Sequence, residues 1–162
     1  CYPEMRLDMV RAGIVLYGLY PSSDEAIYSK MKLKPAMALR TVVNLGKEYK
    51  KGGCISYGRR FTAERDMKVA STAIGYADGY PRELSNGKGR VIIQGQKVPV
   101  IGKICMDMCI LDVTGLTVHE GDEVIVYGEG NTAAEMAEAC GLISYELLTR
   151  ISQRVPRVYI KE

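Results

Sequence analysis

Short apolar runs separated by turn residues fill the chain from residue 36 to residue 127, and long helical periods are rare there. Runs of this kind, bounded by glycine, asparagine and aspartate, predict strands. We expect strands at 36–45, 54–57, 68–74, 90–93, 97–101, 109–113 and 123–127. We also expect a hairpin with Gly95 at its turn, and a second pairing between 109–113 and 123–127 across the loop that joins them.

The pattern changes after residue 130, where helix formers replace the strand-like runs. Thr132 followed three residues later by Glu135 has the spacing of a capping box, in which each residue bonds a backbone N–H of the other. This predicts a helix over 133–139, and Gly141 suits the position just past its end.

The last thirty residues are expected to hold a second short helix and a closing strand. Ser144 is expected to cap a helix over 145–151, and 155–160 reads as a strand in which Pro156 favours an edge or a strand start. The fold class is therefore mainly β, a barrel or sandwich with two short helices near the C-terminus.

The first residues stand apart from this domain. The chain begins at Cys1 rather than at methionine, and Met9 to Gly18 is strongly apolar from the outset, with 10–16 resembling a strand. We expect a piece of a longer protein, entered in mid-fold, with 1–25 as a separate remnant and 26–162 as the β-domain.

Composition and charge exclude several classes. Of 162 residues, 47% are hydrophobic and 25% charged, which is typical of globular domains and not of disordered, collagen-like or coiled-coil chains. The net charge is only +3, and the basic residues are scattered, so a nucleic-acid groove is not expected. No apolar run reaches the ~18–20 residues of a membrane span, and no signal-peptide pattern is present, so we expect a soluble piece.

The five cysteines predict neither a disulfide framework nor a metal site. Their number is odd, and the chain is longer than small disulfide-rich domains. Cys105 and Cys109 are separated by three residues, and the one histidine, His119, follows ten residues after Cys109, whereas zinc needs closer pairs and more ligands. We expect buried free thiols in a reducing cytoplasm.

Four local strings carry the candidate chemistry. The first is Val10-Arg11-Ala12-Gly13-Ile14-Val15-Leu16-Tyr17-Gly18. Its arginine is either a charge at the rim of the fold or a buried group aimed at a ligand. In the second case the backbone N–H groups of Gly13 and Ile14 could hold a phosphate.

The second string is Ile55-Ser56-Tyr57-Gly58. A tyrosine between a strand and a glycine usually packs with its hydroxyl at the surface. To act as a general acid or base, its pKa must fall from about 10 toward the working pH, through nearby cations or hydrogen bonds. The adjacent residues Arg59 and Arg60 are the local cations.

The third and fourth strings are Ile74-Gly75-Tyr76-Ala77-Asp78-Gly79-Tyr80-Pro81-Arg82 and Gly102-Lys103-Ile104-Cys105-Met106-Asp107. The third predicts an ordered loop at a strand end, or simply a tight turn in which Asp78 bonds its own backbone. The fourth is either core followed by a turn or a site loop. A nucleophilic Cys105 would need a base, and His119 is 14 residues away, so a cysteine hydrolase is not favoured.

Together the four strings resemble the C-terminal part of the fold-type III alanine racemase family, which uses pyridoxal 5′-phosphate. They occur in the family's order and at about its spacing, and Arg154-Val155-Pro156-Arg157 is similar to its closing motif. The resemblance covers essentially the whole chain. It implies that 1–25 is the last strand and loop of the family's N-terminal (β/α)8 barrel and that 26–162 is its C-terminal β-domain. The family's Schiff-base lysine motif is not in this sequence.

The resemblance implies roles for residues of the first two strings. Tyr57 corresponds to the second catalytic base, which serves one face of the substrate while the cofactor lysine serves the other. Arg11 corresponds to the arginine that bonds the pyridine nitrogen and leaves it unprotonated, because guanidinium keeps its proton. Gly13 and Ile14 correspond to backbone donors to the cofactor phosphate.

Residues of the other two strings correspond to the substrate side. Met106 matches the residue whose backbone N–H contacts the substrate carboxylate, and Tyr76, Arg82 and Asp107 match residues of the substrate entryway. Lys103 also falls in the entryway, at a position where several relatives have arginine. A lysine ammonium cannot form the bidentate pair with a carboxylate that a guanidinium forms, so such a pair would be lost there.

A further departure leaves the substrate open. Gln153 stands where some relatives have a tyrosine that narrows the pocket, and a smaller side chain there could admit a hydroxymethyl group. Hydroxyl discrimination of this kind is modest. Alanine is favoured, with serine, as in the vancomycin-resistance racemases, as the alternative.

The resemblance also implies partners and a location. The small-molecule substrate would be an amino acid. Full-length chains would form a head-to-tail homodimer in which the β-domain meets the barrel of its own chain and that of a second subunit. The enzyme would be cytoplasmic, or a cytoplasmic domain of a membrane-anchored parent, and would supply D-alanine for peptidoglycan. For the isolated chain, the alternative is a non-catalytic dimerisation or binding module, inactive without the lysine.

Overall fold

The computed structural model describes residue 4, residues 7–22 and residues 32–160, which fall into two compact units, Cys1–Met37 and Ala38–Glu162. In the first unit, the 3-10 helix η2 (Gly13–Tyr17) buries Ile14 and ends at Gly18, whose N–H bonds the Val15 carbonyl. The strand expected over 10–16 is therefore wrong: the backbone there turns into a helix, and Leu16 is exposed. None of the helices in the described ranges is long and apolar enough to cross a membrane.

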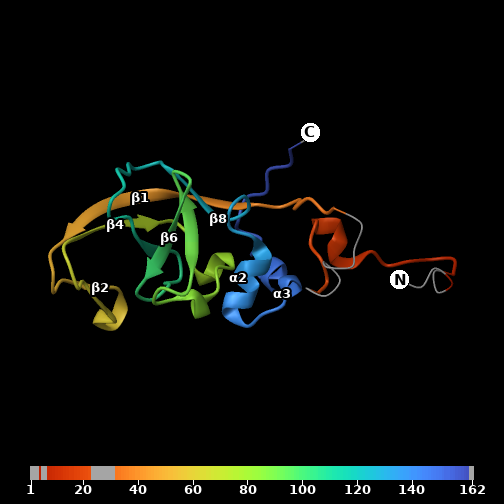
Figure 1. Ribbon diagram of the computed structural model, residues 1–162, viewed down its shortest axis with the longest axis horizontal. Coiled ribbons are helices and arrows are strands. Elements are labelled where there is room, and N and C mark those ends of the chain that lie inside the picture. Colours follow the sequence, from red (N-terminus) through yellow and green to blue (C-terminus); the bar gives the residue numbers. More distant parts are fainter. Residues whose placement is uncertain (1–3, 5–6, 23–31, 161–162) are drawn as a thin grey trace. The chain divides into compact units, whose positions relative to one another are not determined.

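The second unit is built around a closed barrel of six antiparallel strands in the order β1-β4-β7-β6-β5-β8 (Figure 1). The strands are β1 (Leu39–Tyr49), β4 (Met67–Thr72), β5 (Arg90–Ile93), β6 (Gln96–Ile101), β7 (Cys109–Asp112) and β8 (Glu123–Tyr127). A separate two-stranded hairpin joins β2 (Cys54–Ile55) to β3 (Phe61–Thr62). The expected fold class, mainly β with a barrel and two helices, is confirmed.

The long strand β1 closes the barrel. Its first residues pair with β8 and its last residues with β4, with irregular register near each junction. The two ends of β1 thus reach different neighbours, and a shift of register within a strand bends it and increases its twist.

The hairpin over β5 and β6 is confirmed. Gln94 and Gly95 both have positive φ, 49° and 74°, which is the backbone that a two-residue turn between twisted strands requires. The pairing expected between 109–113 and 123–127 is wrong, because this hairpin lies between them. β7 pairs with β4 and β6, and β8 pairs with β1 and β5.

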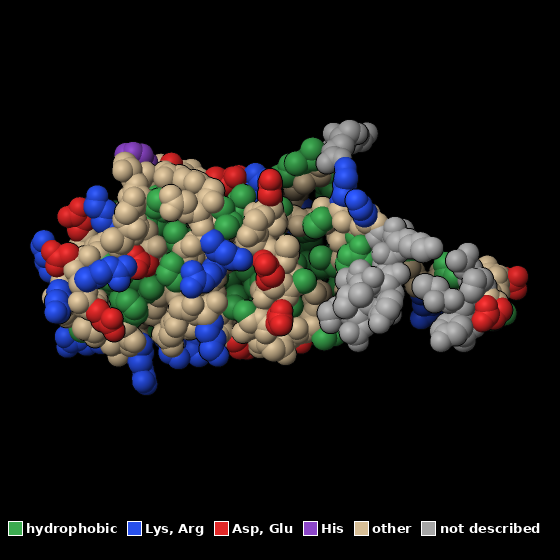
Figure 2. Space-filling view, viewed as in Figure 1, with side chains coloured by type: hydrophobic (Ala, Val, Ile, Leu, Met, Phe, Trp, Pro, Cys, Tyr) green, Lys and Arg blue, Asp and Glu red, His purple; other side chains and the backbone are tan. Residues whose placement is uncertain are grey.

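The barrel interior is filled by aliphatic side chains; along β7 buried residues alternate with less buried ones, whereas three consecutive residues of β5 are buried. Those with no more than 1% exposure on the strands include Val43, Val91, Ile93, Val100, Leu111, Val124 and Val126. On the face shown in Figure 2, basic and acidic side chains are interspersed over the barrel.

Two short helices follow the barrel and pack against each other. α2 (Ala133–Cys140) begins with the expected capping box, in which Thr132 accepts from the Glu135 N–H and the Glu135 carboxylate accepts from the Thr132 N–H. Gly141 ends it in the left-handed conformation, also as expected. α3 (Ser144–Thr149) starts one residue earlier than expected, with Ile143 at the cap position, so the capping role predicted for Ser144 is wrong.

The closing strand expected over 155–160 is also wrong. These residues form no strand, and Val158, Tyr159 and Ile160 are more than 80% exposed. A closed barrel has no free edge to which another strand could be added, which accounts for the difference.

Candidate active site

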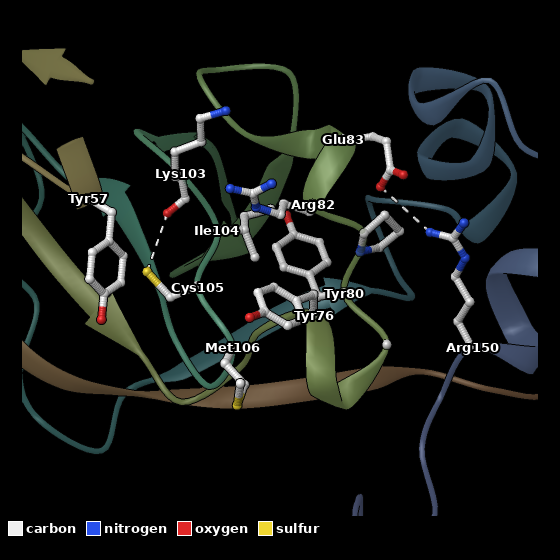
Figure 3. A pocket seen from close by; sticks show the side chains of 12 residues that line it. Tyr57, Tyr76, Tyr80, Arg82, Glu83, Lys103, Ile104, Cys105, Met106 and Arg150 are labelled. Atoms are coloured by element: carbon white, nitrogen blue, oxygen red, sulfur yellow. Dashed lines mark hydrogen bonds and ion pairs between the residues drawn. The ribbon is translucent and has the colours of Figure 1, made fainter. Parts of the chain in front are cut away.

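An open hollow of about 730 Å³ lies on the second unit, where loops from several strands converge (Figure 3). One wall is the tip of the β2–β3 hairpin, another is the loop after β4, and a third is the loop after β6. Side chains from all three walls line it, namely Tyr57, Tyr76, Arg82, Lys103, Cys105 and Met106. Residues as far apart in sequence as Tyr57 and Met106, 49 positions, thus share one surface.

Tyr57 begins η3 (Tyr57–Arg59), the short turn between β2 and β3. Its neighbours adopt unusual backbone angles, with positive φ at Ser56, Gly58 and Arg59. The Tyr57 side chain is 77% exposed, so its hydroxyl is accessible from the hollow. Figure 3 places it at one side, with Cys105 between it and Tyr76.

The loops after β4 and β6 are bonded to each other. The N–H groups of Tyr76 and Ala77 donate to the carbonyls of Cys105 and Met106, both at 3.0 Å. Gly75 permits this approach, because a Cβ atom there would lie 2.2 Å from the Met106 carbonyl oxygen. Tyr76 and Met106 are therefore held on adjacent walls of the hollow.

Asp78 closes the loop after β4 on itself, as expected from its position. Its carboxylate accepts from the Gly75 N–H at 2.8 Å. Asp78 is the last residue of the turn η4 (Tyr76–Asp78), and this bond ties it back to the residue just before the turn. The turn ends at Gly79, whose φ of 105° and close contact with the Arg150 carbonyl leave no room for a side chain.

Arg154 joins this loop to the next one, which the sequence did not predict. Its Nε donates to Asp78 at 2.7 Å, and its guanidinium also bonds Asp107. The hydrogen bonds that the Arg154 guanidinium donates to these two carboxylates raise its pKa, the bond to Asp78 contributing most. In sequence, Arg154 was recognised only as part of the closing motif, because nothing local shows which acidic groups a loop arginine will meet.

Two further residues that were expected at the substrate entryway, Arg82 and Lys103, stand at the rim of the hollow. Arg82 is exposed and Lys103 is half-buried, and both line the hollow. Arg82 opens the short turn η5 (Arg82–Leu84), whose Leu84 is buried beneath it. On the far side, Glu83 and Arg150 form an ion pair at 3.6 Å. The rim therefore carries both signs of charge.

The cysteine in the hollow is not arranged as a nucleophile. Burial raises the pKa of the Cys105 thiol, and its Sγ lies 3.6 Å from the Lys103 carbonyl oxygen. His119 lies on another loop, with its N–H bonded to Asp122. Over the residues that the structure describes, no group of three or more histidine, cysteine, aspartate or glutamate side chains could hold a metal ion.

Arg11, Gly13 and Ile14 belong to the first unit. Arg11 is exposed just before η2, and Gly13 and Ile14 are the first residues of that helix. N–H groups in the first turn of a helix have no acceptor within it, and Gly13 has no side chain to cover them. This chemistry suits an anionic group such as a phosphate.

Comparison with known proteins points to one family. A sequence model described as "Alanine racemase, C-terminal domain" matches residues 36–159. Alanine racemase 1 of Clostridium acetobutylicum is 51% identical over 164 aligned residues, which cover 98% of this chain and 42% of the relative. The chain thus spans less than half the length of the curated relatives it matches.

Solved structures agree with this relationship. The alanine racemase of Clostridium difficile 630 superposes with a TM-score of 0.90 at 42% identity, over 98% of this chain and 41% of that one. The alanine racemase of Bartonella henselae, solved with covalently bound pyridoxal phosphate, superposes with a TM-score of 0.83 at 33% identity, over 91% of this chain and 40% of that one.

Proposed function

Because the chain belongs to the alanine racemase family, whose C-terminal domain it matches, we propose that it is part of an enzyme that interconverts L- and D-alanine with pyridoxal 5′-phosphate. The observation that carries this proposal is Tyr57, an exposed tyrosine on a tightly turned hairpin at the edge of a hollow. Racemisation needs a proton carrier on each face of the substrate α-carbon. Tyr57 supplies one, and a lysine outside this sequence supplies the other.

Tyr57 acts as a general acid and base through its Oη. It takes the α-proton from one enantiomer and returns a proton to the same face in the reverse reaction. Its 77% exposure leaves the hydroxyl free to approach a substrate, and the hairpin places it on a short, constrained turn rather than on a long loop. Both features suit a group that must meet a reacting atom at a fixed position.

The substrate side is formed by the loops after β4 and β6. The Met106 carbonyl accepts from Ala77, whereas no acceptor for the Met106 N–H lies among the residues that the structure describes. This N–H binds the substrate carboxylate. Tyr76, Arg82 and Lys103 line the entryway, where the basic side chains attract the carboxylate. Asp107 belongs to the entryway through its bond to Arg154 and does not line the hollow itself.

The residues of the first unit fit the cofactor. The N–H groups of Gly13 and Ile14, at the start of η2, would hold its phosphate, and Arg11 would donate to its ring nitrogen without giving up a proton. When bound, pyridoxal phosphate withdraws electrons from the substrate and makes its α-proton removable. A guanidinium at the ring nitrogen keeps that withdrawal moderate, which favours proton exchange over side reactions.

The full-length enzyme is proposed to be a cytoplasmic head-to-tail homodimer, in which Tyr57 serves the site of the partner subunit. The domain therefore contacts the barrel of its own chain and that of the second subunit.

The first test is a racemisation assay of the full-length parent with L-alanine and L-serine. We expect alanine to be the better substrate. A higher kcat/KM for serine would show that Gln153 admits the hydroxymethyl group and that the parent is a serine racemase. Activity with neither amino acid would contradict the proposed function.

The second test replaces Tyr57 by phenylalanine, which removes only the proton carrier. Loss of a general acid or base costs ~10²–10⁴ in rate, so we expect a loss in that range with the cofactor still bound. Tyr145→Phe, at an exposed tyrosine on α3, is the matched control and should keep wild-type activity. Unchanged racemisation by Tyr57→Phe would rule out the acid/base role.

The chain by itself is proposed to be inactive, because the cofactor lysine motif is absent from its sequence. Residues 1–162 incubated with pyridoxal phosphate should neither racemise alanine nor form a stable adduct. A borohydride-reducible adduct at one lysine would contradict this.

A further inference from the structure

The residue before Tyr57 has a backbone conformation that side chains rarely adopt. Ser56 lies at φ 72° and ψ 168°, a region populated almost only by glycine. Such a conformation persists only where the surroundings impose it. It also decides the direction in which the next residue leaves the strand β2.

Two hydrogen bonds to a single residue hold Ser56 in place. Its Oγ accepts from the Lys103 N–H at 2.7 Å and donates to the Lys103 carbonyl oxygen at 3.2 Å. The hydroxyl thus bonds both the N–H and the carbonyl of Lys103, a residue 47 positions away. Because the contact is partly buried, water competes poorly for it.

Gly102 makes this contact possible. A Cβ atom at Gly102 would lie 2.4 Å from the Ser56 Cβ, and the φ of Gly102 is 64°. Two positive-φ residues therefore face each other where the hairpin meets the loop after β6. That same loop continues into Cys105 and Met106, which line the hollow.

We propose that Ser56 is a positioning residue for Tyr57, and that its hydrogen bonds to Lys103 fix the tyrosine against the wall that carries Met106. The inference deepens the proposed function and rests on it, because Ser56 matters to the reaction only through Tyr57. Without the hydroxyl, the hairpin tip is free to move relative to that wall. The Tyr57 Oη then spends less time where a substrate α-carbon can meet it.

Two substitutions separate the hydroxyl from the backbone conformation. Ser56→Gly accepts the observed φ and ψ without strain but loses both hydrogen bonds. Ser56→Ala loses the bonds and keeps the strain, so its hairpin should relax away from the observed conformation. We therefore expect activity to fall in the order wild type, Ser56→Gly, Ser56→Ala. Ser144→Ala, at a serine that makes no cap bond, is the matched control and should leave activity unchanged.

The measurements use the full-length holoenzyme. We expect Ser56→Ala to lower kcat about 10–100-fold, since small misplacements of catalytic groups cost up to ~10²-fold, with KM changed less than about threefold. The kinetic isotope effect of α-deuterated alanine should rise only for the enantiomer whose proton Tyr57 carries. In a Tyr57→Phe background, adding Ser56→Ala should change the rate less than about twofold.

A purely structural serine would behave differently. It would give a variant with lower stability but unchanged isotope effects, and its loss of rate would persist in the Tyr57→Phe background. Either result would overturn the positioning role. Should Ser56→Ala fail to fold, Ser56→Gly carries the same test, because glycine tolerates the observed backbone.

The two levels of proposal fail separately. Low activity of Tyr57→Phe together with wild-type kinetics of both Ser56 variants would overturn the role of Ser56 and leave the proposed function intact. Full activity of Tyr57→Phe would overturn the acid/base role of the tyrosine and, with it, the positioning role of Ser56.

Discussion

The barrel and the hairpin that carries Tyr57 differ in strand pairing, in burial and in backbone conformation. The barrel strands pair on both sides, and interior residues such as Leu111 and Val124 have no exposed surface. The hairpin strands β2 and β3 have two residues each, and three of the four residues 56–59 have positive φ. Tyr57 at its tip is 77% exposed.

This difference separates a rigid barrel from a hairpin tip whose backbone is strained. A closed barrel leaves no edge to fray, so its loops emerge from a fixed frame. The strained turn is held by contacts to a neighbouring loop, not by its own short strands. Stored strain at an exposed group is typical of a functional position, and the barrel sustains it.

The largest difference between the barrel and the hairpin is expected in the reactivity of their cysteine thiols. Burial raises the pKa of Cys109 in the barrel to about 12, whereas Arg59 and then Thr62 lower the pKa of Cys54 in the hairpin. Because the thiolate is the reactive form, we expect Cys54 to be alkylated at least ~10³-fold faster than Cys109 at pH 8. Mass spectrometry of the labelled chain measures both rates. Comparable rates without denaturant would show that the barrel opens readily.

The second largest effect is expected when a buried side chain of the barrel is shortened. Leu111 is fully buried, so Leu111→Ala should lower the free energy of unfolding by about 2–5 kcal/mol. Leu45→Ala, on β1 where the side chain is 59% exposed, is the matched control and should stay within about 0.5 kcal/mol. Denaturant unfolding of the chain measures both. A small effect at Leu111 would mean that the barrel interior is loosely packed.

The hydrogen bonds that hold the loops of the candidate site should contribute less to the free energy of unfolding. Asp78→Asn removes a charged acceptor from the Gly75 N–H, and we expect a loss of about 1–2 kcal/mol in the same unfolding assay. The bond to Arg154 should add little, because that side chain is half-exposed. Glu123→Gln, which breaks an exposed pair with Arg40, is the control and should cost less. Equal losses would show that the site loops behave as ordinary surface.

The capping box of α2 should give the smallest effect. Thr132→Ala removes the acceptor of the Glu135 N–H and should cost about 1 kcal/mol. The hydrogen bond from the Thr132 N–H lowers the pKa of Glu135, so its contribution is complete above the ordinary carboxyl pKa and is lost as the pH falls through the lowered value.

Glu135→Gln checks that pH dependence. The variant should be less stable than the wild type at pH 7, and the difference should disappear once the carboxyl is protonated in acid. A difference that stays constant from pH 7 to pH 3 would contradict a role for the charge. Thermal unfolding followed at several pH values measures it.

What the sequence predicted well depends on neighbouring residues. The turn at Gly95, the capping box at Thr132 and Glu135, and the end of α2 at Gly141 are each set within about five residues. Their conformations follow from backbone freedom and side-chain hydrogen bonds that need no distant partner. The strands over 90–93 and 123–127 also agree with the structure, because apolar runs bounded by turn residues mark where a strand lies even though they do not name its partner.

Choices between alternative partners needed the tertiary structure. Runs of similar hydrophobicity do not say which strand lies beside which. The pattern therefore paired β7 with β8, whereas the hairpin of β5 and β6 lies between them in the barrel. The run 155–160 has the composition of a strand, but the barrel closes without it.

The candidate site divides in the same way. The sequence by itself predicted which residues carry chemistry, because Tyr57 and Met106 lie in strings that resemble a known family, and it predicted the turn closed by Asp78. Only the tertiary structure decided what holds them. Ser56 meets Lys103 across 47 positions, and Asp78 meets Arg154 across 76. Hydrogen bonds between distant segments depend on where the barrel brings its loops together, and no local pattern along the chain contains that information.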